Sequence, residues 1–131
     1  MVGGMFATCS LVCTLALTAC SGSTITQPQD VMFPNSNVSF IGQVLPFLVV
    51  TCANAGCHND MAAAAGIRLT SYSAVLFGRP NLCVPSEPDE SLMIQVLDGT
   101  MKHDFGDLQQ RVSPAQIKGL RQWVIEGALN N

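Results

Sequence analysis

The segment from Cys52 to His58 constrains this chain more than any other part of its sequence. It reads Cys-Ala-Asn-Ala-Gly-Cys-His, so four residues separate two cysteines, and a histidine follows the second cysteine directly. Two thiols and an imidazole are therefore confined to one short loop. The chemistry open to this loop depends on the compartment, because oxidising conditions join free thiols into disulfides.

The N-terminus predicts export. Residues 1–19 form an apolar run with no charged residue before Asp30, and the run is too short for a bilayer-spanning helix of about 20 residues. We interpret it as a signal peptide. It ends in Leu17-Thr18-Ala19-Cys20, which resembles the lipobox of bacterial lipoproteins. We therefore expect a lipid on Cys20 that anchors the protein to a bacterial membrane, in the periplasm or at the cell surface. An ordinary cleaved signal peptide is the alternative.

Three cysteines remain after the anchor, namely Cys52, Cys57 and Cys83. An odd number of thiols in an oxidising compartment cannot all pair with one another, so at least one needs another chemistry. Two cysteines followed by a histidine are what covalent attachment of a c-type haem requires, because each thiol adds to a porphyrin vinyl group and the imidazole binds the iron. We therefore predict one haem c held by thioethers from Cys52 and Cys57, with His58 as the proximal iron ligand.

Other interpretations of these residues stay open. Cys52 and Cys57 can form a disulfide with His58 on the surface, in a haem-free binding or scaffold lipoprotein. Together with Cys83 and His103 they also reach the ligand number of a zinc site, although an oxidising compartment disfavours free thiolates. In the haem interpretation Cys83 is either a buried thiol or the partner of one of the two loop cysteines, which would leave a single thioether.

The remaining sequence predicts a helical domain behind a tether. Residues 20–37 follow the anchor with a stretch rich in Ser, Thr, Gln, Pro and Asn, which is typical of a flexible linker. Residues 38–131 carry helical periodicity and no alternating strand pattern, so we expect an all-α domain. Pro46 either kinks the first helix or begins a shorter one, and Ser113 caps the last. The expected helices cover residues 40–51, 61–65, 71–77, 90–97 and 114–126.

Four motifs in this domain follow one another in an order that resembles a known family. They are Val44-Leu45-Pro46-Phe47-Leu48, Gly66-Ile67-Arg68-Leu69-Thr70-Ser71-Tyr72, Val84-Pro85-Ser86-Glu87-Pro88-Asp89-Glu90-Ser91-Leu92-Met93 and Trp123-Val124-Ile125-Glu126-Gly127-Ala128. Together with the Cys/His segment they resemble the cytochrome-c-like domains of exported planctomycete, bacteroidete and myxobacterial proteins. The resemblance covers roughly residues 38–131. Ser86 stands where the family has glycine.

The resemblance implies a small class I cytochrome-c-like domain around one haem. In that family a methionine before the last helix, usually in Met-Pro-Pro, supplies the distal iron ligand. Met101 occupies this position, although Lys102 and His103 follow it in place of the prolines. We therefore expect Met101 as the distal ligand, with His103 as the alternative, and Lys102 and Arg111 as candidate contacts of the haem propionates.

The predicted function is electron transfer without enzymatic activity, because two axial ligands leave the iron no open position. The expected partners are the membrane, through the lipid on Cys20, and redox proteins. Nucleic acid is not an expected partner, because the six Lys and Arg residues are spread singly along a chain of net charge −3.

Overall fold

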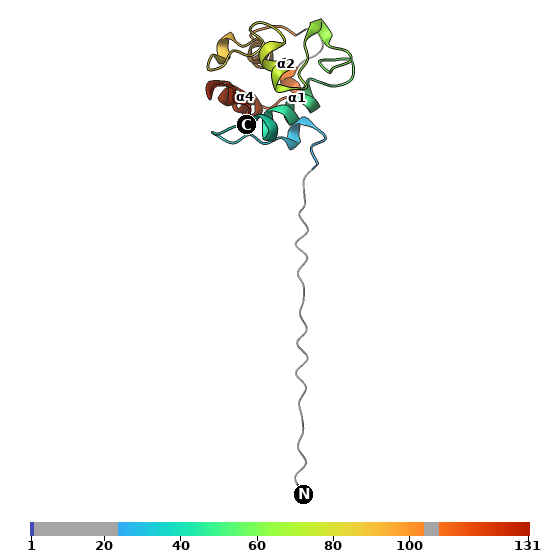
Figure 1. Cartoon of the computed structure of the whole chain (residues 1–131), viewed down its shortest axis with the longest axis vertical. Helices are drawn as coiled ribbons and strands as arrows, with labels where there is room; N and C mark the ends of the chain where they lie inside the picture. The colour runs from blue at the N-terminus through green and yellow to red at the C-terminus, as the bar shows by residue number, and fades with distance from the viewer. Residues whose placement is uncertain (2–23, 104–107) are drawn as a thin grey trace.

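The protein folds into a helical domain. The computed structural model describes Met1, residues 24–103 and residues 108–131, and these residues form helices and no strand (Figure 1). The all-α expectation is therefore confirmed for this part of the chain. The predicted signal peptide beyond Met1 and the predicted lipidation site, Cys20, lie outside the described residues. The α-helices are α1 (Leu45–Thr51), α2 (Tyr72–Phe77), α3 (Leu92–Asp98) and α4 (Pro114–Ile125).

No helix in the described part of the chain is long and apolar enough to span a bilayer.

Pro46 determines how the first helical segment is built. Ser39 caps it, since the Ser39 hydroxyl accepts a hydrogen bond from the Gly42 amide at 3.0 Å. A π-helical turn, Phe40–Val44, comes first and leads into α1, where Pro46 stands in the first turn. Proline has no amide to donate, and its ring crowds the carbonyl four residues earlier. The wider π turn accommodates this, so the expected helix over 40–51 is one segment with two hydrogen-bonding patterns.

Helix α4 begins and ends at local signals. The Ser113 hydroxyl accepts from the Gln116 amide at 3.3 Å, the Gln116 side chain accepts from the Ser113 amide at 3.0 Å, and Pro114 takes the first helical position. Gly127, with φ of +94°, follows the end of the helix. The predicted helix over 114–126 is thus confirmed to within one residue.

Aromatic contacts join the first and last helical segments. Trp123 of α4 is fully buried, and its ring centre lies 5.6 Å from that of Phe40. The Phe40 ring also packs edge-on against Tyr72 of α2 at 5.2 Å. Polar atoms of these rings bind the chain after α4: Trp123 Nε1 donates to the Leu129 carbonyl and the Tyr72 hydroxyl to the Ala128 carbonyl, each at 2.9 Å. The π-helical turn that leads into α1 lies against α4. The C-terminal Asn131 bonds to the start of this turn, and Figure 1 shows the C-terminus close to α4.

The segment before α3 differs from the expected single helix over 90–97. A 3-10 turn, Pro88–Glu90, precedes α3, and the fully buried Ser91 separates the two. The Ser91 hydroxyl donates to the Glu87 carbonyl at 3.0 Å and accepts from the Val84 amide at 2.8 Å. These bonds satisfy the backbone of the turn. Likewise, residues 61–65 form turns that lead into a short 3-10 segment, Ala64–Gly66, rather than an α-helix, because Ala63 and Ala65 adopt left-handed φ angles.

The folded part begins earlier than the boundary at residue 38 that we expected. Val31 is 2% exposed and belongs to the core, and the Phe33 ring packs edge-on against Phe47 at 5.6 Å. The Gln116 side chain of α4 also donates to the Val31 carbonyl at 3.2 Å. Because residues 20–37 are mostly polar, the sequence did not indicate that Val31 and Phe33 pack against the domain. The linker prediction is therefore wrong for residues 28–33.

We expect Gly119→Ala to destabilise the fold by about 1–3 kcal/mol, because a Cβ at this position of α4 would overlap the Phe33 side chain. Urea denaturation measures the free energy of unfolding. Lys118→Ala, on the exposed side of the same helix, serves as the control and should change it little. A gain in stability for Gly119→Ala, as expected of a glycine in an uncrowded helix, would contradict the contact.

Stability should also depend on the Glu126 carboxylate. The Gln122 side chain and the amides of Val38 and Asn37 donate to it, and these bonds hold the pKa of Glu126 below its ordinary value. A carboxyl whose pKa is lower in the folded state stabilises the fold at neutral pH, and this contribution is lost as the pH falls from about 5 to about 3. We expect Glu126→Gln to make the urea midpoint less dependent on pH across that range. The exposed Glu90→Gln should leave the pH dependence of the midpoint unchanged.

Candidate functional site

One cavity of about 370 Å³ collects the chemistry-bearing residues that the sequence singled out. Cys52, Cys57 and His58 line one part of its wall, and Met101 and His103 also line it. Its volume lies within the range of about 300–1,000 Å³ that is usual for small-molecule sites. Most of the remaining wall is aliphatic. The aliphatic lining residues are Leu48, Ile67, Leu69, Leu82, Leu92, Val96, Leu97 and Leu108.

The four-residue spacer between the cysteines forms a closed turn. The Asn54 side chain caps the C-terminal end of α1, because its amide donates to the Val50 and Thr51 carbonyls at 3.0 and 3.2 Å. The Cys57 amide then donates to the Asn54 carbonyl at 3.0 Å, and the His58 amide to the Cys52 carbonyl at 3.1 Å. The last bond brings the start and the end of the Cys/His segment together, so the spacer does not separate the two thiols from the imidazole.

The surroundings of the His58 ring favour one tautomer. Its Nδ1 lies 3.4 Å from the Ile67 carbonyl oxygen, which can only accept, so a hydrogen bond between them requires the proton on Nδ1. The lone pair is then on Nε2, which is the atom left to bind a metal. A ring nitrogen that donates to a backbone carbonyl is the usual support of a metal-binding histidine. The Leu69 amide donates back to the His58 carbonyl at 2.9 Å and fixes the two segments side by side.

The three described cysteines are free thiols. Removal from bulk water raises the pKa of Cys52 to about 12, and the neighbouring Cys57 adds to the rise. Burial likewise raises the pKa of Cys83 to about 12. Cys83 is 4% exposed and is not part of the cavity lining, which agrees with a buried thiol that packs as a small apolar side chain.

The zinc alternative finds no support among the residues that the structure describes. They contain no group of three or more His, Cys, Asp or Glu side chains placed to hold a metal ion. Cys83 belongs to the core cluster instead of the cavity wall, so the four ligands required by that alternative are not gathered at one place.

Both candidates for the distal ligand reach the cavity from the chain after α3. Helix α3 ends at Gly99, whose φ is +82°, and the Met101 amide then donates to the Gln95 carbonyl at 2.8 Å. Met101 remains 38% exposed. The ring centre of His103 lies 6.1 Å from that of His58, and the two ring planes form an angle of 67°.

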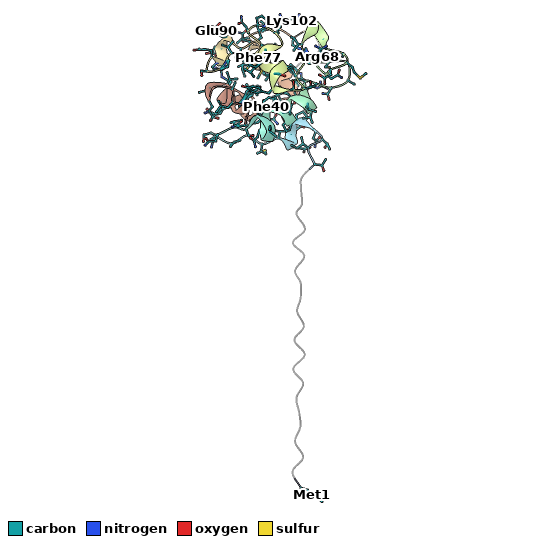
Figure 2. All side chains as sticks on the ribbon, in the orientation of Figure 1. Met1, Phe40, Arg68, Phe77, Glu90 and Lys102 are labelled. Atoms are coloured by element: carbon teal, nitrogen blue, oxygen red, sulfur yellow. The ribbon has the colours of Figure 1, made fainter. Side chains whose placement is uncertain are left out.

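Cationic side chains complete the lining. Arg79, Lys102 and Arg111 all line the cavity, and they are half of the six Lys and Arg residues in the chain. No acidic side chain of the described residues lines it. Figure 2 shows Lys102 at the end of the domain away from Phe40. An apolar wall with cations beside it suits a ligand that has an apolar body and carboxylate groups.

Two contributors were missed by the sequence analysis. Arg79 stands in a Gly-Arg-Pro sequence that signals only the end of α2, and nothing local relates it to a cavity. Thr51 lines the cavity at the end of α1, and its hydroxyl is buried without a hydrogen-bond partner. A threonine on the apolar face of a helix next to Cys52 was a usable signal for a polar atom near the site.

Comparisons with known proteins do not assign a family or a function to this chain. No protein-family model, no curated protein and no solved structure matches the chain.

The thiols provide a direct test of this geometry. In the mature haem-free protein at pH 8 we expect iodoacetamide to modify Cys57 first. Cys52 and Cys83 should react only after unfolding, because a pKa of about 12 leaves on the order of one thiolate in ten thousand. Peptide mass spectrometry reports the order of modification. If Cys83 alone is modified after unfolding without reductant, Cys52 and Cys57 are joined by a disulfide and the free-thiol site is refuted.

Proposed function

We propose that the protein is an electron carrier with one covalently bound haem c, exported and anchored to a membrane through a lipid on Cys20. The observation that carries the proposal is that one cavity gathers two thiols, a histidine with its Nε2 lone pair available, and a second ring opposite it. The N-terminal apolar run and its lipobox-like end support export and anchoring.

The chain's groups match the parts of a haem. Cys52 and Cys57 suit the two vinyl groups, and His58 Nε2 suits the iron. Leu48, Leu97 and the other aliphatic lining residues suit the faces of the macrocycle. Arg79, Lys102 and Arg111 suit the two propionates, because guanidinium and ammonium groups form charge-assisted hydrogen bonds with carboxylates.

Each residue has a defined task in electron transfer. A bound haem supplies iron that alternates between the ferric and ferrous states. Cys52 and Cys57 would hold it by adding their S–H bonds across the vinyl double bonds, so that sulfur and hydrogen both end on the former vinyl group and no oxidant is needed. His58 would bind the iron through Nε2. The aliphatic wall excludes water, and the cations offset the charge of the propionates.

The same arrangement argues against catalysis. A side chain from the Met101–His103 segment occupies the second axial position in this proposal, so no substrate has access to the iron. Electrons then pass to and from partner proteins without any bond to substrate. Anchoring through Cys20 keeps the domain near redox proteins of the membrane.

Covalent haem is the decisive test. The full-length protein, produced in cells with an active c-type maturation system, should keep its Soret absorbance after acid–acetone extraction and gain the mass of one haem. Cys83→Ala should behave like the parent protein. Cys52→Ala and Cys57→Ala should each retain at most one thioether, and the double variant none.

A colourless product from cells that attach haem to a control cytochrome would refute the proposal. If that product also contained a Cys52–Cys57 disulfide, the haem-free binding or scaffold lipoprotein would be the better description.

A further inference from the structure

We infer that His103, rather than Met101, is the second axial ligand of the iron. This inference rests on the proposed function, since it concerns the same cavity and the same metal. The sequence resemblance favoured Met101, because a methionine precedes the last helix in that family. The positions of the side chains in the cavity favour the imidazole.

The separation of the two rings is the first argument. An imidazole nitrogen binds a transition metal at about 2 Å and lies about 1 Å from the centre of its ring, so two imidazoles on opposite sides of one metal have centres about 6 Å apart. The centres of His58 and His103 are 6.1 Å apart. Two rings that share a metal axis can take any angle about it, and the observed 67° is compatible with this arrangement.

The path of the chain is the second argument. The Met101 amide binds the Gln95 carbonyl at 2.8 Å, and the Thr100 hydroxyl donates to the same carbonyl at 3.2 Å, so this part of the chain is held against the end of α3. Met101 leaves 38% of its surface exposed from this position. His103 is less exposed, and its ring centre lies 6.1 Å from that of His58. Of the two candidates, His103 is therefore the more enclosed one and the one whose ring pairs with that of His58.

The choice of ligand changes what the carrier does. A thioether favours ferrous iron and raises the reduction potential, whereas a second imidazole lowers it. With His103 as ligand, the protein donates electrons at a lower potential than a cytochrome with a methionine ligand. It therefore accepts electrons only from stronger reductants.

Spectra of the covalently loaded, full-length protein test the inference. We expect the ferric parent to be low-spin and to lack the far-red absorption band of methionine–iron ligation. Met101→Leu is the matched variant from the same turn, and it should leave the ferric iron low-spin and the far-red band absent, because both imidazoles are kept. His103→Met should introduce the far-red band and raise the potential.

His103→Ala separates ligation from a structural role. We expect this variant to become high-spin and to bind carbon monoxide readily when reduced. Added imidazole should restore the low-spin spectrum, because the free ring fills the vacated position. A residue that only supports the fold would not be replaced in this way.

The outcomes separate the two proposals. A loaded parent with the far-red band, lost in Met101→Leu and kept in His103→Ala, overturns the ligand assignment and leaves the haem carrier intact. Persistence of the low-spin spectrum in His103→Ala also overturns the assignment. Absence of covalent haem from the parent overturns both the ligand assignment and the proposed function.

Discussion

The contact between Phe40 and Trp123 is the interaction on which the arrangement of the domain depends. It joins the first helical segment to the last, with ring centres 5.6 Å apart in a fully buried environment. Phe33 packs closely over Gly119 beside it. With these helices fixed, the end of α1 presents Cys52 to the cavity, and α3 lines the same cavity with Met93 and Leu97. The cavity shares part of its wall with the hydrophobic core, so the site is built into the fold. The shared residues are Leu48, Leu69, Leu82, Met93 and Leu97.

Local signals explain which parts of the fold were predictable. Helix α4 was expected to within one residue because Ser113, Pro114 and Gly127 act on the backbone within a few residues of themselves. Pro46 gave two alternatives, and the shorter helix is confirmed, since α1 begins at Leu45 with Pro46 in its first turn. The π-helical turn before it was not expected, because it depends on packing that no short window contains. Val31 and Phe33 were hidden for a related reason, since two apolar residues in a polar stretch have no periodicity.

The residues of the candidate site that are adjacent in sequence were predictable, whereas those brought to it by tertiary folding were not. Cys52, Cys57 and His58 were found from their adjacency, and the structure brings all three to one cavity. Arg79 joins them from a turn 21 residues after His58, through folding alone. The preference between Met101 and His103 also depends on a distance across the cavity. Cys52 is half-buried, and its raised pKa makes its thiol a poor nucleophile in the folded domain.

The packing of residues 28–33 against α4 sets how far the domain can stand from a lipid on Cys20. Only seven residues lie between Cys20 and Pro28, where the docked segment begins, so eight Cα–Cα steps span this distance. Whatever their conformation, eight such steps reach at most about 28 Å, which is close to the diameter of a small domain. In the proposed lipid-anchored carrier, a linker of this length would keep the domain within a thin layer above the bilayer. Redox partners would then have to present their centres at that height.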